Sequence, residues 1–287
     1  MTVSVLTLTR NRRAHLLNLM ESLRLQTERP DELVIACMQE AVEPDLPDIG
    51  IPVRQFLVPG ERLPLARARN RAAARANGET LVFLDVDCIA SPPLVARFEA
   101  AARGGAGLFL GEVRYLPGGA VGRPLDFEAL HACGIVHPSK PPMPQTGLRE
   151  EPDTGEFWGL SFAISAASWT QLGGMDESFV GYGGEETDLA ARLKPAGLPL
   201  FWTAGAVAYH QHHAVHVPPL PHFHAIIANA RRFHAKHGRW CMDYWLGQFA
   251  GMGLIAWTPA APDIVVERDP TGAEIAAARQ PDSVRFS

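Results

Sequence analysis

Hydrophobic positions in the first third of the chain form short apolar runs, separated by longer stretches in which apolar residues recur with helical spacing. Short runs rich in β-branched side chains are typical of strands. The strand candidates are Val3–Thr9, Glu32–Cys37, Val53–Val58 and Thr80–Leu84, and the helix candidates between them are Leu16–Leu25 and Pro64–Ala76. Because strands alternate with helices, the sequence predicts an α/β fold whose sheet is mostly parallel and flanked by helices.

The second half of the chain has a less regular pattern. Residues 104–151 are rich in glycine and proline, so we expect a long loop there. A strand is predicted at 157–165, and a glycine-rich segment after it enters a helix near Glu185. Beyond a proline-rich link, Ala225–Lys236 and Trp240–Ile255 are predicted helices, and a loose tail is expected after them.

Composition and charge narrow the class of protein. The chain has 287 residues, 47% of them apolar and 20% charged, which is enough to bury a large core. A net charge of -5 spread along the chain disfavours nucleic-acid binding. The four cysteines are far apart without a C-x-x-C pair and are expected to be reduced thiols. Without a signal-peptide pattern or an apolar window of transmembrane length, we expect a cytoplasmic location.

Polar residues follow three of the predicted strands. Thr9–Arg12, Met38 and Asp85–Asp87 would meet at the carboxyl edge of a parallel sheet, where such folds bind ligands. Neither a G-x-G-x-x-G nor a P-loop motif follows these strands. A phosphate group would therefore have to be bound by other means.

Asp85 and Asp87 form a D-x-D motif at the end of a buried strand. Strand alternation would turn both carboxylates to one side, and such oxygen ligands suit Mg²⁺ or Mn²⁺ with a bound diphosphate. Alone the motif is weak, because acidic residues often end strands as turn formers or helix caps.

Glu185, Glu186 and Asp188 follow a glycine-rich segment at the start of a predicted helix. Acidic residues in a first turn complement the helix dipole, which is a purely structural explanation. A glutamate beside a second glutamate could also act as a general base that takes a proton from a hydroxyl.

Histidines are concentrated in the segment Tyr209–His213. Imidazole completes a carboxylate metal site well, although exposed histidine clusters are common without a metal. Strand alternation would point His210 and His212 the same way, so the pattern leaves open which of the two is a ligand.

Together these segments resemble glycosyltransferase family 2, with a galactosyltransferase-like C-terminal module similar to those of bacterial chondroitin polymerases and animal beta-1,4-galactosyltransferases. The similarity covers about residues 2–214. The segments that carry it are Thr7–Asn11, Ala68–Asn70, Asp85–Asp87, Gly173–Glu177, Tyr182–Glu186 and Ala208–Gln211.

The resemblance implies a GT-A, Rossmann-like fold and the inverting transfer of a sugar from a nucleotide diphosphate sugar, expected to be a UDP-sugar, to an acceptor hydroxyl. It implies Mn²⁺ or Mg²⁺ as cofactor, held by Asp85, Asp87 and His210. It makes Glu186 the catalytic base and places Glu185 at the acceptor. The residues expected to contact the nucleotide sugar are Thr9, Arg10, Asn11, Met38, Gln39, Arg69, Asn70, Asp85, Gly159 and Ser161.

The resemblance also predicts a domain organisation. Residues 1–216 would form the transferase domain, with a nucleotide-sugar-binding half at 1–103 and an acceptor and catalytic half at 104–216. Residues 217–258 would form a helical segment and 259–287 a loose tail. The aromatic side chains between His222 and Trp257 form more apolar surface than a solvated segment would carry. We expect this surface to be buried by an acceptor, by a second copy of the chain, or by simple packing on the transferase core.

Two departures from the family pattern matter. The family usually has an acidic pair after the second strand, whereas this chain has Ala36–Gln39, which weakens the preference for uridine. The family's catalytic aspartate is replaced by Glu186, a longer carboxylate. Two other functions stay open: a sugar-phosphate nucleotidyltransferase, disfavoured because no glycine-rich loop follows the first strand, and a non-catalytic carbohydrate- or partner-binding domain.

Overall fold

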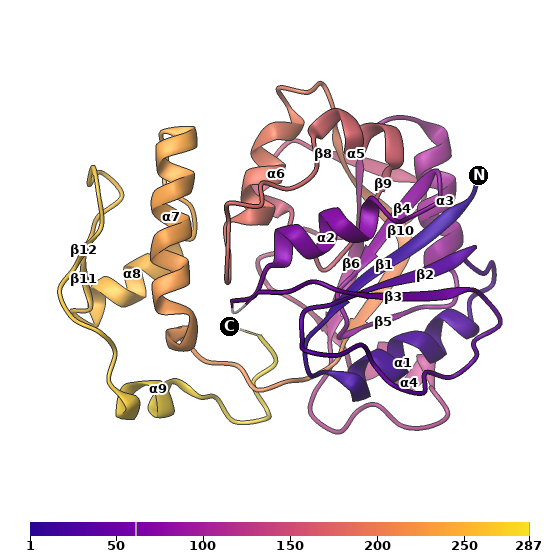
Figure 1. The fold of residues 1–287 in the computed structure, drawn as a ribbon, viewed down its shortest axis with the longest axis horizontal. Helices are drawn as coiled ribbons and strands as arrows, with labels where there is room; N and C mark the ends of the chain where they lie inside the picture. Colours follow the sequence, from indigo (N-terminus) through magenta and orange to yellow (C-terminus); the bar gives the residue numbers. More distant parts are fainter. Residues whose placement is uncertain (61, 287) are drawn as a thin grey trace.

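The computed structural model describes residues 1–60 and 62–286 and contains a large sheet with helices on both sides (Figure 1). The strands are β1 (Val3–Thr9), β2 (Glu32–Cys37), β3 (Val53–Leu57), β4 (Thr80–Leu84), β5 (Cys88–Ala90), β6 (Leu108–Tyr115), β7 (Ile135–Val136), β8 (Leu148–Glu151), β9 (Ser161–Ser165), β10 (Leu200–His210), β11 (Ile255–Ala256) and β12 (Val265–Val266). The helices are α1 (Arg13–Arg24), α2 (Leu65–Ala73), α3 (Leu94–Gly104), α4 (Phe127–Cys133), α5 (Ala166–Leu172), α6 (Glu185–Leu193), α7 (Phe223–His237), α8 (Asp243–Gly251) and α9 (Gly272–Ala278), with 3-10 turns η1 (Thr154–Glu156) and η2 (Leu220–His222). None of the described helices has the length and apolar character needed to cross a membrane.

The main sheet has the strand order β3-β2-β1-β4-β9-β6-β10-β5. Its first half is parallel, because β1 pairs in parallel with both β2 and β4, and β2 with β3. In the second half β9 runs antiparallel to β4 and β6, while β6 and β10 are parallel. The α/β class with a mixed sheet flanked by helices, predicted from the alternating pattern, is therefore confirmed.

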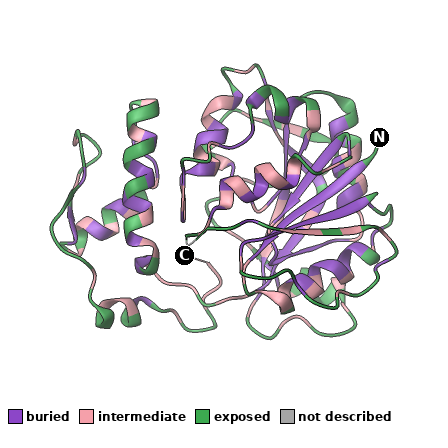
Figure 2. Ribbon diagram, in the orientation of Figure 1, coloured by how far each residue is buried: buried purple, intermediate pink, exposed green. Residues whose placement is uncertain are grey.

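The core lies on both faces of this sheet, as the buried central strands in Figure 2 show. Alternate residues of β1 serve the two faces, as strand geometry requires. Val3 and Val5 pack with the buried residues of α1 and α3, and Leu6 and Leu8 pack with those of α2, α5 and α6. The central strands β1, β2 and β4 thus bury side chains in two directions, which explains why their sequences read as continuous apolar runs.

The expected loop over residues 104–151 is wrong, because this range contains β6, α4, β7 and β8. Residues 108–115 form β6, a central strand between β9 and β10. Its first residues, Leu108–Leu110, are buried, whereas Glu112 and Arg114 are partly exposed and form an ion pair of 2.6 Å. Polar residues in the second half of the strand interrupt the apolar run, which hides the strand in the sequence pattern.

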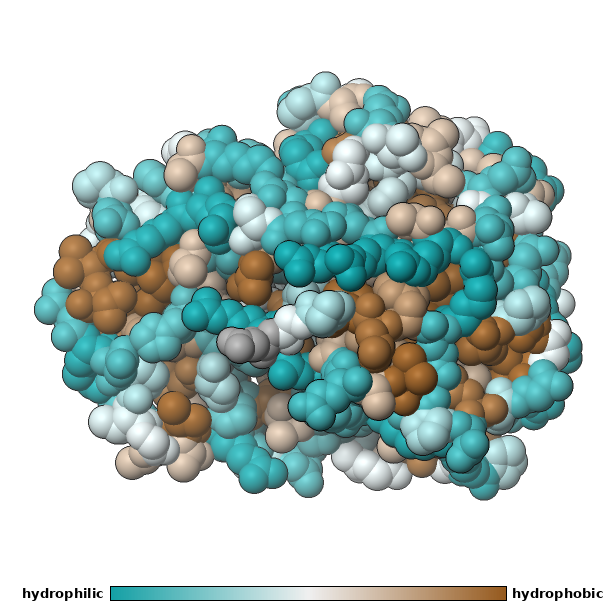
Figure 3. All heavy atoms as spheres, in the orientation of Figure 1, coloured by the Kyte–Doolittle hydropathy of each residue, from teal (hydrophilic) through white to brown (hydrophobic). Residues whose placement is uncertain are grey.

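The helices after residue 222 pack against the main body. Their buried apolar residues form one cluster with Phe179 of the main body, and Tyr182 and Ala191 pack at its edge. The aromatic residues are therefore covered largely by one another and in part by packing on the main body, one of the three possibilities open from the sequence. Figure 3 shows apolar surface at the left of this helical body, the region where Figure 1 places β11 and β12. Val265 and Val266 of β12 are exposed.

The predicted loose tail is more ordered than its composition suggests. It contains β12 and α9, and α9 begins with a capping box in which Thr271 and Glu274 bond each other's backbone. Beyond α9 the chain returns to the main body, where Arg285 donates a hydrogen bond of 2.7 Å to the carbonyl of Cys133. The ring of Phe286 packs against Tyr115 and His137. Residue 287, the last of the predicted tail, lies outside the described residues.

Candidate active site

Three side chains form a cluster suited to a metal because of the register between two strands. Asp87 lies between β4 and β5, and β5 pairs antiparallel with the end of β10, where His210 is opposite Cys88. This pairing places His210 Nε2 3.5 Å from Asp87 Oδ1, and His213 Nε2 lies 3.6 Å from Asp87 Oδ2. Within the described parts of the chain, Asp87, His210 and His213 form the group whose ligand atoms all lie within 4.8 Å of one another. We call these three residues the metal-capable cluster.

The chemistry of the metal-capable cluster fits a divalent ion. Asp87 Oδ1 and His210 Nδ1 are buried without a hydrogen-bond partner, so the cluster has unused polar atoms. Burial lowers the pKa of His210, and burial together with the nearby Arg12 guanidinium lowers the pKa of His213 to about 4. Both imidazoles are therefore neutral near pH 7, the form that binds metals. The carboxylate suits Mn²⁺ or Mg²⁺, and the two neutral imidazoles are ligands that divalent first-row metals accept.

The predicted ligand set differs from this cluster in two ways. Asp85 is not a member of the cluster, because its carboxylate pairs with Arg69 instead. Asp85 and Asp87 are expected to point to the same side of the strand, but they have different partners. His213, which the sequence pattern did not single out, joins in place of His212, because β10 ends at His210 and strand alternation does not extend past it.

A second cluster surrounds the guanidinium of Arg69, which is almost completely buried. Arg69 lies 2.9 Å from Asp85, 3.4 Å from Glu185 and 3.0 Å from Glu186. The three carboxylates come from the end of β4 and the first turn of α6, and α2 presents Arg69 between them. We call these four residues the carboxylate cluster.

One guanidinium does not fully compensate three carboxylates, of which Glu185 is buried and the other two are partly exposed. Burial raises the pKa of Asp85 to about 6 and of Glu186 to about 8, although Arg69 opposes both shifts, and burial also raises the pKa of Glu185. Repulsion between the carboxylates adds to these increases. Glu186 is also the most exposed of them, with a side chain 25% accessible. A partly exposed carboxylate with a pKa near the working pH suits a general base.

Polar groups at the ends of β1 and β2 adjoin the metal-capable cluster. The backbone N–H of Met38 donates a hydrogen bond to the Thr9 carbonyl at 2.8 Å, and the backbone N–H of Asn11 donates one to Gln39 Oε1 at 2.7 Å. Arg10 lies in the same loop. The next residue in this loop, Arg12, donates a hydrogen bond of 2.6 Å to Asp87. The residues expected to hold a nucleotide are therefore brought together at one edge of the sheet, and Arg12 joins them although the sequence reasoning missed it.

Two residues expected at the nucleotide sugar are engaged within the protein instead. Arg69 is held by the carboxylate cluster. The Asn70 side chain donates to the carbonyl of Met175 and accepts from its amide, both at 2.8 Å, and also donates to Glu177. Asn70 thus fixes the turn after α5. The segment Ala68–Asn70 therefore supports the site through contacts within the protein.

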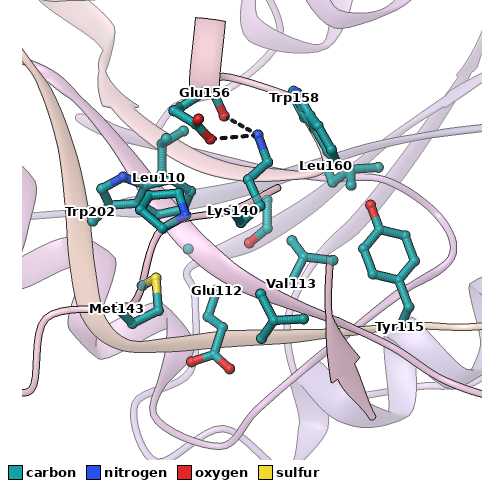
Figure 4. Close-up of a pocket in the computed structure, with 15 residues that line it drawn as sticks. Leu110, Glu112, Val113, Tyr115, Lys140, Met143, Glu156, Trp158, Leu160 and Trp202 are labelled. Carbon is teal, nitrogen blue, oxygen red and sulfur yellow. Dashed lines mark hydrogen bonds and ion pairs between the residues drawn. The ribbon is translucent and has the colours of Figure 1, made fainter. Parts of the chain in front are cut away.

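A pocket lined by Gly159 and Ser161 also has neighbours of both clusters in its wall (Figure 4). Tyr115 lines the pocket, and its ring centre lies 4.9 Å from that of His210. Gly159, which also lines the pocket, adjoins Glu186, because a Cβ atom at Gly159 would lie 2.2 Å from Glu186 Oε1. The wall of this pocket therefore includes one neighbour of the metal-capable cluster and one neighbour of Glu186.

The pocket also contains a cation that the sequence reasoning missed. Figure 4 shows Lys140 directed toward Glu156, whose carbonyl and carboxylate accept hydrogen bonds at 2.8 and 3.0 Å. The Lys140 ammonium also lies 3.4 Å from the ring centre of Trp158. Burial lowers the pKa of Lys140 to about 8. Lys140 lies in the irregular region 104–151, where no sequence pattern distinguishes one polar residue from another.

The contact between Gly159 and Glu186 allows a prediction. Gly159→Ala should reduce turnover about tenfold, because the new methyl group displaces Glu186, and a misplacement of ~1 Å can cost up to ~10²-fold. Gly147→Ala is the matched control, since Gly147 has a similar positive φ of 63° but no atom within 4 Å of the new Cβ. Steady-state rates of both variants measure the effect. Equal rates for the two variants would show that backbone strain, not contact with Glu186, is responsible.

Comparisons with known proteins find matches to glycosyltransferases. A family profile described as "Glycosyl transferase family 2" matches residues 50–165, and one described as "N-terminal domain of galactosyltransferase" matches residues 148–216. Validoxylamine A glucosyltransferase of Streptomyces hygroscopicus subsp. jinggangensis (strain 5008) is 43% identical over 44 residues. That match covers 15% of this chain and only 10% of the relative.

Solved structures show the same fold at low sequence identity. GalNAc-T7 with UDP, GalNAc and Mn²⁺ has a TM-score of 0.52 at 18% identity, covering 74% of this chain and 43% of that chain. S. aureus TarS 1-349 has a TM-score of 0.52 at 14% identity, covering 80% of this chain and 64% of that chain. The fold and the two profiles define a glycosyltransferase of the GT-A class. Residues 50–165 match the family 2 profile, and residues 148–216 are galactosyltransferase-like.

Proposed function

We propose that this chain transfers a sugar from a UDP-sugar to an acceptor hydroxyl with inversion at the anomeric carbon. The observation that carries the proposal is the pocket lined by Tyr115, which neighbours His210 of the metal-capable cluster, and by Gly159, which neighbours Glu186. An inverting single displacement needs charge stabilisation at the leaving group and a base on the opposite face of the sugar. UDP as the nucleotide is supported by the ligands of the GalNAc-T7 structure.

The metal-capable cluster would hold Mn²⁺ or Mg²⁺ at the diphosphate. When bound, such an ion neutralises the negative charge that develops on the leaving group. Asp87, His210 and His213 supply the ligand atoms. Arg12 already lies on Asp87 and is the protein cation best placed to turn toward a phosphate oxygen. Thr9, Arg10, Asn11, Met38 and Gln39 line the nucleotide side, and Gly159 and Ser161 border the donor sugar.

Glu186 would accept the proton of the acceptor hydroxyl. As the hydroxyl oxygen forms a bond to the anomeric carbon, the bond from that carbon to the diphosphate oxygen breaks, and UDP leaves with the electron pair. Arg69 would hold Glu186 and Glu185 in place, and Glu185 would orient the acceptor. Asp85, paired with Arg69 on the other side, would contact the donor.

Residues 1–216 are the proposed transferase domain, with the donor half at 1–103 and the acceptor half at 104–216. Residues 217–258 would support it as a helical segment. This assignment is consistent with a site whose side chains come from strands and helices before residue 214.

The proposed base should give a characteristic pH dependence. Glu186 acts as a carboxylate, and its pKa is raised to about 8, so kcat/KM should rise with pH below about 8 and level off above it. Lys140 has a pKa in the same range, so Lys140→Arg, which stays charged, is the control and should retain the rise. A flat profile in the wild type between pH 6 and 9 would contradict the assignment of Glu186.

The function can be tested with a panel of nucleotide sugars. Thermal shift with Mn²⁺ identifies the donor, and release of free UDP with a carbohydrate acceptor measures transfer. Pyrophosphate formation from a sugar phosphate and UTP would indicate a nucleotidyltransferase instead. Binding of a sugar without any turnover would indicate a carbohydrate-binding domain.

A further inference from the structure

A buried asparagine of the C-terminal helical segment forms hydrogen bonds with the loop that leads into α6. Asn229 of α7 is 1% exposed. Its side-chain amide donates hydrogen bonds to the carbonyls of Gly183 at 2.7 Å, Val180 at 3.2 Å and Tyr182 at 3.5 Å. These carbonyls lie immediately before Glu185, the first residue of α6.

The loop at residues 181–184, here called the glycine loop, has a conformation that depends on these contacts. Gly181, Gly183 and Gly184 all have positive φ, between 84° and 95°. A glycine-rich loop of this kind gains little order from its own side chains. Neighbouring elements must therefore fix its conformation.

Other residues of the C-terminal segment close around the same loop. A Cβ atom at Gly183 would lie 2.5 Å from the sulfur of Met242, and one at Gly184 would lie 3.3 Å from the Cβ of Asn229. The Tyr182 ring stacks on His222, with ring centres 4.5 Å apart. These contacts come from η2, α7 and the start of α8, so the segment surrounds the glycine loop.

A set of charged contacts joins α6 to α7 one turn further along. Asp188 of α6 is completely buried and lies 2.7 Å from Lys236 and 2.9 Å from His237. Figure 1 shows α7 beside α6 across the boundary between the two bodies. The start of α6 is thus fixed by Asn229, and the next turn by Asp188.

We propose that Asn229 is a positioning residue for Glu186: its amide bonds to the glycine loop fix where α6 begins and hence where the Glu186 carboxylate lies. The inference rests on the proposed function, because it assigns Glu186 as the base. It gives the C-terminal segment a part in the chemistry, beyond the roles in acceptor binding or self-association expected from its aromatic residues. A shift of α6 would move Glu186 relative to Gly159 and Arg69, which both touch it.

The test uses Asn229→Leu and Asn229→Asp in the full chain. Leucine has a similar size but donates no hydrogen bond, and aspartate places a carboxylate against the loop carbonyls. We expect kcat for UDP release to fall about tenfold with the KM for the donor nearly unchanged, because Asn229 bonds the loop before the proposed base and not the residues proposed to bind the nucleotide. The donors tested are UDP-glucose, UDP-galactose and their N-acetylated forms, with Mn²⁺.

Ile227→Ala is the matched control on the same helix. Ile227 is also buried, but no hydrogen bond links its side chain to the glycine loop, so the substitution loosens α7 without removing those bonds. We expect it to lower the Tm while kcat per folded molecule stays near the wild-type value. If Ile227→Ala lowers kcat as much as Asn229→Leu at matched stability, general loosening of α7 explains the effect and the proposal fails.

Hydrogen exchange separates this proposal from the proposed function. Amides of residues 179–188 should exchange at least about tenfold faster in Asn229→Leu than in the wild type and in Ile227→Ala, because local opening becomes easier. Unchanged exchange, or an unchanged kcat, would overturn the proposal. If the wild type releases no UDP from any donor, the proposed function fails, and the exchange measurement alone then decides whether Asn229 positions α6.

Discussion

Asp87→Ala is expected to abolish metal-dependent binding of UDP and to reduce sugar transfer by at least about 10²-fold, since even loss of a partner outside the ligand shell of a metal costs ~10–100-fold. Asp87 is the central residue of the metal-capable cluster, because both histidine nitrogens approach it. Titration of UDP with and without Mn²⁺, followed by calorimetry, measures the effect. Addition of a chelator to the wild type should have the same result.

The fold of this variant should persist. Asp87 is buried, but its guanidinium partner, Arg12, has a side chain 34% exposed and can return to solvent. We therefore expect a Tm change within about 5 °C, and circular dichroism should be unchanged. Asp269→Ala removes an exposed carboxylate and is the control for charge alone. Full activity of the wild type after removal of all metal would disprove the metal role.

Glu186→Gln should reduce kcat by roughly 10²-fold or more while donor binding persists, since general-base catalysis usually contributes ~10²–10⁴-fold. The amide keeps the size of the side chain and can still contact Arg69, but it cannot accept a proton. Single-turnover rates with saturating donor isolate the chemical step. The rise of the rate with pH should also disappear in this variant.

Glu185→Gln is the comparison that tests which glutamate is the base. Glu185 is more deeply buried than Glu186, with a side chain 4% exposed, and it is further from Arg69. We expect a smaller loss of rate, expressed mainly as weaker acceptor binding. An inactive Glu185→Gln together with an active Glu186→Gln would reverse the two assignments.

The sequence predicts the first half of the fold well because each unit carries its own signal. The strands at Val3, Glu32 and Thr80 are buried on both faces, so they appear as continuous apolar runs of strand length. The strand β6 is equally central, but Glu112 and Arg114 pair with each other near the pocket and interrupt its apolar run. A strand that packs in the core at one end and lines a pocket at the other does not have a continuous apolar sequence.

The site is predictable only as far as local geometry extends. Asp87 and His210 are found from motifs, whereas the third member of the cluster, His213, depends on where β10 ends and the chain turns. The role of Arg69 is less visible still. Its three carboxylate partners are 16, 116 and 117 positions away in the chain, and only the folded sheet brings them together.

The return of the chain to the main body after α9 matters for how the protein should be produced. Phe286 packs on Tyr115, and the Tyr115 ring lies beside His210, so a peptide attached after residue 286 would start close to the metal-capable cluster. A polyhistidine purification tag there could supply imidazoles to that site and compete for the added metal. Figure 1 shows the amino terminus at the opposite edge of the sheet. An amino-terminal tag that is cleaved before assay would keep foreign histidines away from Asp87.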